Sequence, residues 1–204
     1  MKIQINDTIH ELNTESAETL SQLVGIIETE ILTPLEEVIT SIEVNDSNLS
    51  DEDEIKFADF PTVQIQTLKI ESCKPTKLVL DGLNDCAQIL PKVIETLDSC
   101  VEKLSHDDIN EAMNDFIVVT DGIQWFTTIF NGALSIYDTK INEQTKFVQI
   151  GMRLTELLNE ILEAHSNSDL TQFSDLLEYE LSPLIEEIIM EAPSFRNELE
   201  GIKL

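Results

Sequence analysis

The stretch 79–104, VLDGLNDCAQILPKVIETLDSCVEKL, carries the clearest structural signal in the chain. Its apolar residues recur at intervals of three and four, which keeps them on one face of a helix for about seven turns. They are Val79, Leu83, Cys86, Leu90, Val93, Leu97, Val101 and Leu104. Pro91 lies inside the stretch and should kink the helix, because proline lacks a backbone donor. The pattern predicts a long amphipathic helix that packs against others.

Three further apolar stripes with the same periodicity follow this stretch. They cover residues 109–137, 147–161 and 170–188. Pro183 should kink the last of these helices. Four amphipathic helices with short polar connections pack most simply as an up-down bundle. We therefore expect a helical bundle over residues 75–204, with a loose tail or a short tail helix after Pro193.

In residues 1–72 the spacing of the apolar residues changes along the chain, and the order of these changes predicts the order of strands and helix. Apolar residues first alternate with polar ones, then recur at helical spacing, and then alternate again. The predicted elements are a hairpin over 3–12, a helix over 20–31 that Pro34 ends, and strands over 40–44 and 63–72. The acidic run Asp51-Glu-Asp-Glu is expected on a loop. The order strand, strand, helix, strand, strand predicts a β-grasp, or ubiquitin-like, unit over residues 1–72 and an α+β fold class for the chain.

The amino-acid composition restricts the classes of molecule that the chain is expected to bind. The 204-residue chain is 42% apolar, enough to bury a core, and its 12 Lys and Arg against 40 Asp and Glu give a formal charge of −28. This charge repels phosphate backbones and anionic lipids and also favours solubility. Met1-Lys-Ile-Gln-Ile-Asn lacks the apolar run of a secretory signal, and no stretch is long enough to span a membrane. We expect a cytoplasmic protein that binds neither nucleic acid nor membranes.

The usual patterns for catalysis, cofactors and metals are missing from the sequence. The three cysteines, Cys73, Cys86 and Cys100, form no C-x-x-C pair, and the last two are expected to be small buried hydrophobes. A calcium loop near Asp46 fails, because Asp51 stands where glycine is required. No G-x-S-x-G or phosphate-binding glycine loop occurs. We predict no catalytic residue, cofactor or metal.

The helix predicted over 109–137 is unusually aromatic. It holds Phe116, Trp125, Phe126, Phe130 and Tyr137, five of the eleven aromatic residues (eight Phe, two Tyr, one Trp). Gly122 should allow close helix packing, and Trp125 lies about 100° round the helix from Phe126, which favours partial exposure. We therefore expect association with a protein partner or a second copy through this helix, with Trp125, Phe126 and Tyr137 as candidate interface residues.

Two motifs in the helical part resemble those of a group of uncharacterised bacterial proteins. They are Asp121-Gly-Ile-Gln-Trp and Asp175-Leu-Leu-Glu-Tyr-Glu-Leu-Ser-Pro-Leu-Ile-Glu-Glu. Some members of that group carry a β-grasp-like front half. The resemblance implies the same architecture and a bacterial source, and it implies no activity.

Together these observations favour a non-catalytic adaptor or chaperone-like protein of the bacterial cytosol. Two alternatives stay open: a carboxylate-based metal-binding or enzymatic bundle, and an acidic decoy of a nucleic-acid-binding protein. An adaptor would show an apolar groove, whereas an enzyme would show a pocket lined by carboxylates with shifted pKa values. A decoy would carry acids at the spacing of phosphates.

Overall fold

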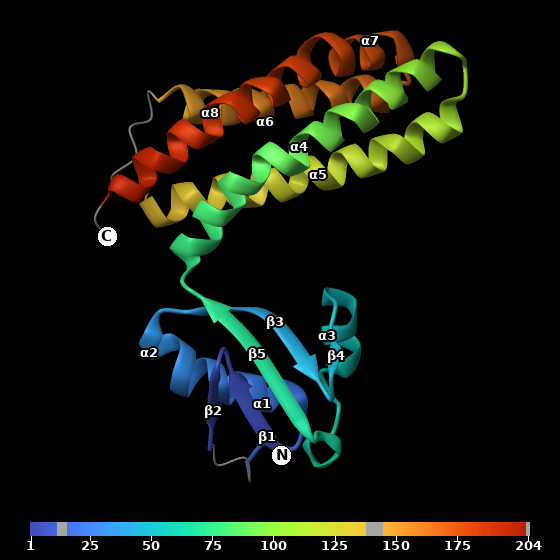
Figure 1. The fold of residues 1–204 in the computed structure, drawn as a ribbon. Coiled ribbons are helices and arrows are strands. Elements are labelled where there is room, and N and C mark those ends of the chain that lie inside the picture. Colours follow the sequence, from blue (N-terminus) through green and yellow to red (C-terminus); the bar gives the residue numbers. More distant parts are fainter. Residues whose placement is uncertain (12–15, 138–144, 203–204) are drawn as a thin grey trace. The chain divides into compact units, whose positions relative to one another are not determined.

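A computed structural model describes residues 1–11, 16–137 and 145–202. It confirms the α+β class, with a sheet-containing front part followed by helices (Figure 1). The chain divides into two compact units, Met1–Lys77 and Leu78–Leu204. The division falls just after the predicted boundary, in the first turn of the long helix that begins at Pro75. Each unit has its own hydrophobic core.

The front unit contains a five-stranded mixed sheet in the order β2-β1-β5-β3-β4. Its strands are β1 (Lys2–Ile5), β2 (Thr8–His10), β3 (Val38–Val44), β4 (Ser47–Asn48) and β5 (Thr67–Cys73). The first and last strands pair in parallel at the centre, and the other pairs are antiparallel. This arrangement is β-grasp-like, as predicted. The predicted end of the hairpin at Leu12 lies outside the described residues.

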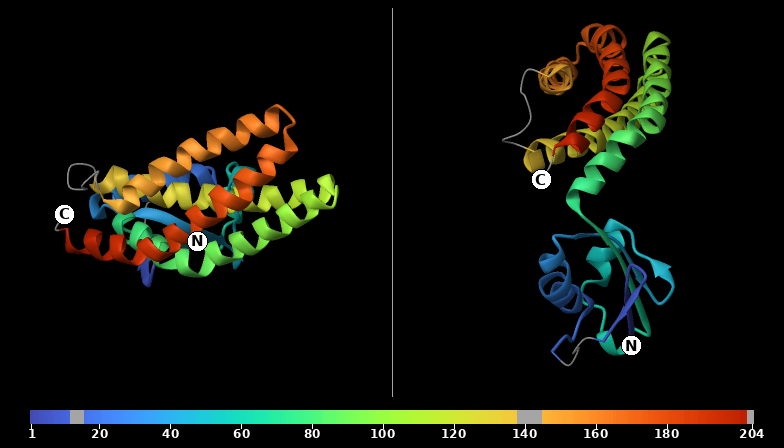
Figure 2. Two further views of the ribbon diagram at one scale, coloured as in Figure 1. Left: turned by 90° about the horizontal axis from the view of Figure 1, so that it is seen from above. Right: turned by 60° about the vertical axis from the view of Figure 1, so that its left-hand side comes forward.

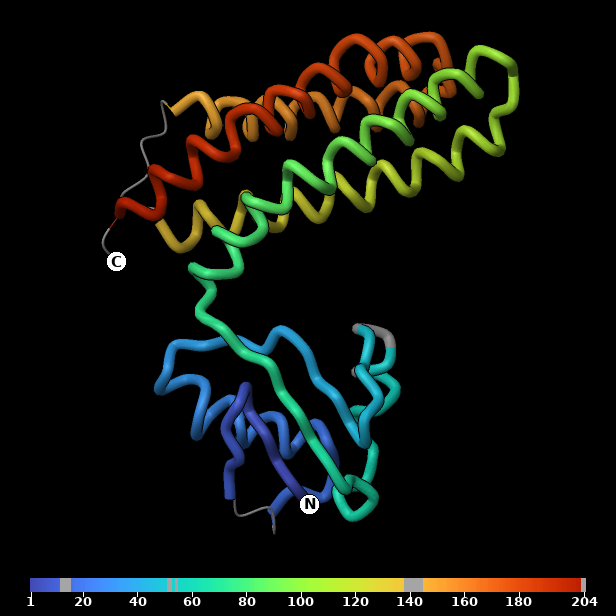
Figure 3. The backbone as a smooth tube through the Cα atoms, viewed as in Figure 1, coloured from blue at the N-terminus to red at the C-terminus, as the bar shows by residue number. Residues whose placement is uncertain are grey.

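Helical segments complete the front unit, and Figure 3 traces the path of the backbone through them. They are α1 (Leu20–Ile27), the π-helix η1 (Glu28–Leu32), α2 (Thr33–Leu35), α3 (Asp51–Phe57) and the 3-10 helix η2 (Thr62–Gln64). Leu23 and Ile27 of α1 are fully buried in one core with Leu68 and Ile70 of β5. The helix over 20–31 was predicted correctly in its core, although it runs on past Pro34 to Leu35.

Two predictions about the front unit were wrong in detail. The last strand begins at Thr67, because Val63 lies in η2 with 92% of its surface exposed. The acidic run from Asp51 starts a helix instead of a loop. Its N-terminus is stabilised by a capping box, in which the Ser50 side chain accepts from the Asp53 backbone N–H and the Asp53 carboxylate accepts from the Ser50 backbone.

The rear unit is an up-down bundle, in which successive long helices run in opposite directions (Figures 1 and 2). Its elements are α4 (Pro75–Ser105), α5 (Ile109–Tyr137), α6 (Lys146–Ser166), α7 (Leu170–Asp175), the π-helix η3 (Leu176–Leu181) and α8 (Ser182–Gly201). The α7, η3 and α8 segments follow one another without a gap and form the fourth long helix. Close packing at Gly122 is confirmed, since a Cβ there would meet Val93 Cγ2 at 2.4 Å.

Pro91, Pro183 and Pro193 each lie within a helix. Helix α4 continues through Pro91. Before Pro183 the hydrogen bonding shifts, so that the Ser182 N–H donates to the carbonyl of Leu177, five residues back. The loose tail predicted after Pro193 was wrong, because α8 runs on to Gly201. Phe195 is 2% exposed, and its burial offsets the helix-breaking tendency of the nearby proline.

Candidate functional site

The three residues predicted as an interface occupy different environments. Trp125 is half-buried and packs against the core of the bundle. Phe126 and Tyr137 are each 2% exposed, so in this structure they belong to the core of the bundle and not to its surface. The ring of Phe126 packs between Phe130 and Phe147, with centroid separations of 6.2 and 6.0 Å. These two side chains stabilise the bundle and leave Trp125 as the accessible member of the set.

A groove lies instead along the seam between α5 and α6. Its volume is about 360 Å³, near the lower end of the roughly 300 to 1,000 Å³ that is common for ligand sites. It is open to solvent and mainly apolar. The lining residues are Phe116, Thr120, Ile123, Gln124, Thr127, Thr128, Leu158, Ile161 and Leu162. None of them is charged.

The three threonines make the wall less polar than their side chains suggest. The Thr120 hydroxyl donates to the carbonyl oxygen of Ile117 at 2.7 Å. Thr127 donates to the carbonyl of Ile123 at 2.9 Å, and Thr128 to that of Gln124 at 3.0 Å. Their donors are therefore satisfied within α5, and each side chain still offers its methyl group and the lone pairs of its hydroxyl oxygen.

Aromatic contacts support the groove at Phe116. The Phe116 ring meets that of Phe173 edge to face, with centroids 4.9 Å apart. Phe173 is fully buried and lies 5.6 Å from the ring of His165, near the end of α6. These contacts connect α5, α6 and α7, so this part of the wall is held by the bundle core.

The groove and Trp125 lie on different flanks of α5. Successive residues turn by about 100° in an α-helix, so Gln124 lies about 100° and Trp125 about 200° round from the buried Ile123. By the same count Ile117, which is 59% exposed, lies on the groove side, and Val118, which is 55% exposed, lies near the Trp125 flank. The aromatic residues singled out in the sequence therefore lie mostly away from the groove, and only Phe116 lines it. The groove was not predicted from the sequence, because threonine and glutamine form part of its lining and their pattern resembles ordinary polar surface.

Of the three acids of α5, one borders the groove, and another is paired with a cation of α4 on the other side of the helix. Helix α5 contains Glu111, Asp115 and Asp121 and no Lys, Arg or His. Asp115 accepts from Lys103 of α4 at 2.6 Å and from Ser99 at 2.7 Å. These bonds lower the pKa of Asp115 and the first of them raises the pKa of Lys103.

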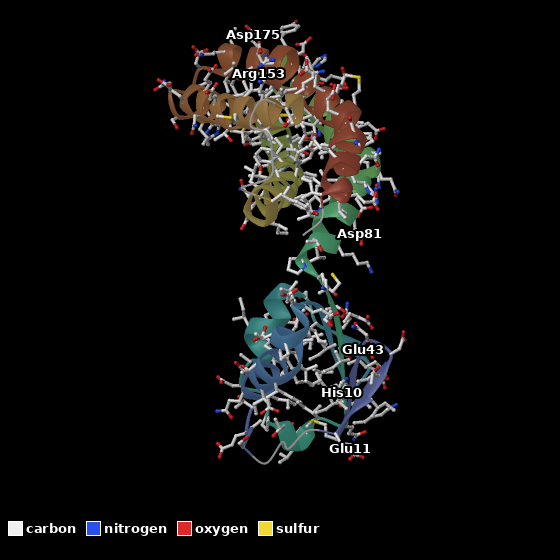
Figure 4. The ribbon with its side chains drawn as sticks, turned by 90° about the vertical axis from the view of Figure 1, so that its left-hand side faces the viewer. His10, Glu11, Glu43, Asp81, Arg153 and Asp175 are labelled. Carbon is white, nitrogen blue, oxygen red and sulfur yellow. The ribbon has the colours of Figure 1, made fainter. Side chains whose placement is uncertain are left out.

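The two cations of α6 are both paired with acids of the fourth helix. Lys146 contacts Glu191, and Arg153, labelled in Figure 4, contacts Glu180, each at 2.7 Å. They are therefore already engaged on the side of α6 that faces the fourth helix. Asp121 is exposed one turn from Ile117 on the open side of α5, where its carboxylate is available to an incoming cation.

Among the described residues, the cysteines, the possible metal ligands and a second cavity add no reactive group to the groove. Cys86 and Cys100 are fully buried, as predicted, and burial raises the pKa of the first to about 12 and of the second to about 11. Within the described ranges no three His, Cys, Asp or Glu side chains gather to form a metal site. A second cavity, of about 330 Å³, lies in the front unit beside α1, where Gly25 and Glu28 help to line it. No helix of the described chain combines the length and apolarity of a bilayer span.

The fold and the groove define a β-grasp-like unit joined in sequence to an up-down bundle that has an open apolar seam between α5 and α6. Residues 81–191 match the family described as "Domain of unknown function (DUF8042)". The match covers more than half of the chain, which therefore belongs to this family. It runs from the first turns of α4 into α8 and includes every groove-lining residue. No curated protein and no solved structure matches the chain.

Proposed function

We propose that this chain is a non-catalytic protein-binding protein of the bacterial cytoplasm, an adaptor or a chaperone-like protein. The observation that carries the proposal is the open apolar groove between α5 and α6. Covering apolar surface that is open to water stabilises a complex, by about 25 cal/mol for each Å² removed from solvent. The groove has the size and accessibility to receive apolar side chains of another protein.

The chemistry of the lining also favours binding over catalysis. Acid–base or nucleophilic catalysis needs an ionisable or activated group within hydrogen-bond reach of the substrate. The groove offers threonine hydroxyls that already donate to their own helix, one glutamine, and aliphatic or aromatic side chains. Such a surface can recognise shape and apolarity.

Site-specific photo-crosslinking in the native cell tests this proposal. A benzophenone amino acid replaces Gln124 in the groove or, as a matched control, Val118 on the Trp125 flank of the same helix. We expect ultraviolet light to produce a discrete adduct from the Gln124 position and much less from Val118. Mass spectrometry should place the crosslink in an apolar segment of the partner.

The two positions also separate the groove from the interface predicted around Trp125. An adduct from Val118 but not from Gln124 would overturn the groove and favour the Trp125 flank. Equal labelling at both positions, or none at either, would also count against the proposal. Circular dichroism of both variants would establish that the helices remain folded.

A further inference from the structure

The geometry points to one class of occupant, and we propose that the groove binds a basic amphipathic α-helix of the partner. This inference rests on the proposed function and specifies the partner. The apolar residues of the partner's helix would enter the groove, and Lys or Arg residues beside them would contact the acids at the rim of the groove. Three observations support it: the state of the backbone donors in the wall, the length of the groove, and the distribution of charge.

The walls favour a helix over an extended peptide. An extended segment leaves its backbone N–H and C=O groups unpaired unless a sheet edge or polar side chains receive them. Both walls here are helices, whose backbone groups bond internally, and the three threonine hydroxyls already donate to α5. Only their oxygen lone pairs and the side-chain amide of Gln124 remain in the lining for a peptide backbone, too few to pair an extended segment. A helix satisfies its own backbone, so it can lie against this surface without leaving buried polar groups unpaired.

The length of the groove matches a few helical turns. Its lining on α5 extends from Phe116 to Thr128, which at about 1.5 Å per residue corresponds to roughly 18 Å. A docked helix covers that distance with about 12 residues and presents apolar side chains at positions i, i+3 or i+4, and i+7. The occupant thus needs a short apolar stripe.

Charge specifies the flanks of that stripe. Asp121 lies on the open side of α5, Glu163 is exposed beside Leu162 on α6, and α5 carries no Lys, Arg or His. The cations of α6 are held by Glu180 and Glu191. An acidic helix or an anionic lipid would therefore meet repulsion, whereas Lys and Arg would be attracted at long range and paired at the rim.

Designed peptides provide the test with the full-length protein. Three fluorescent 16-residue peptides are compared by anisotropy: a helix of Leu and Lys with Leu at helical spacing, the same helix with Glu for Lys, and a basic peptide with Ser for Leu. We expect the Leu/Lys helix to bind at least about tenfold more tightly than either other peptide, because it alone matches both the apolar surface and the charge.

A matched pair of variants locates the binding. Leu162 lines the groove and is 58% exposed, whereas Met152 on the same helix is 59% exposed and is not part of the lining. Leu162→Gln should weaken binding of the Leu/Lys helix by about five- to tenfold, through loss of apolar contact. Met152→Gln should change it less than about twofold. Both substitutions replace an exposed side chain and should leave the bundle folded.

The other outcomes contradict the inference in distinguishable ways. If the Leu/Glu helix binds as tightly and depends on Leu162, the groove takes apolar helices and the charge requirement is wrong. If the Ser-containing basic peptide binds as tightly, or if Leu162→Gln has no effect, attraction to the overall charge explains the binding and the groove does not. If no peptide binds, the inference falls, while crosslinking at Gln124 still decides the proposed function.

Discussion

A Phe195→Ala variant is expected to lose about 3 to 5 kcal/mol of unfolding free energy in the helical unit. Phe195 is 2% exposed, and its ring stacks on that of Phe147 with centroids 4.3 Å apart. Phe147 in turn lies 6.0 Å from both Phe126 and Phe130. Removing the ring opens a cavity beside this aromatic cluster, because its neighbours come from α5 and α6 and cannot all move inward together.

Urea denaturation followed by fluorescence measures this loss directly. Trp125 is the only tryptophan and lies in the helical unit, so its emission reports unfolding of that unit without a signal from the front unit. Met190→Ala is the matched control, since Met190 lies in the same helix and is 65% exposed. The control should stay within about 0.5 kcal/mol of the wild type. A Phe195→Ala variant as stable as the control would mean that the segment after Pro193 is not part of the core.

A Gly151→Ala variant is expected to lose about 2 kcal/mol, even though alanine favours helix by about 1 kcal/mol over glycine. A Cβ at Gly151 of α6 would lie 2.3 Å from Phe130 Cζ, and two more atoms of that ring would be within 3 Å. The ring is 6% exposed and enclosed by the aromatic cluster, so it cannot move aside without displacing Phe126 or Phe147.

Gly132→Ala is the control for this second prediction. Its Cβ would meet a single methyl group, Val79 Cγ2, at 3.2 Å, so a small adjustment suffices and the loss should be clearly smaller. Adding Phe130→Leu to Gly151→Ala should recover part of the loss, because the smaller side chain makes room for the new methyl group. Additive losses in the double variant, as tested by a double-mutant cycle in urea, would contradict direct contact between the two positions.

The long helices could be predicted from sequence because their periodicity continues over many turns. Val79, Leu83 and Leu97 are all buried in one core, as their spacing indicates. The order of elements in the front unit was sufficient to predict its β-grasp-like sheet. Errors arose where two local signals compete. Val63 has high strand propensity, yet it follows Pro61 into a 3-10 turn and is exposed.

The helix after Pro193 and the groove between α5 and α6 were harder to predict from the sequence, because both depend on contacts between distant parts of the chain. Pro193 is a strong local signal against a helix, but contacts of Phe195 and Leu199 with the distant core decide the outcome. The groove depends on how far α5 and α6 stand apart and on which way three hydroxyl groups turn, and neither is encoded in periodicity. A sequence therefore identifies an aromatic helix as unusual without identifying which of its faces is open.

The front sheet ends on both sides in its shortest strands. The β2 strand has three residues and β4 has two, and together they form the edges. An unpaired strand edge is a template on which another chain can extend the ladder, and a short edge offers few backbone donors and acceptors for that purpose. Pairing of one front unit with another through their sheet edges, and so growth of fibres by this route, is consequently disfavoured.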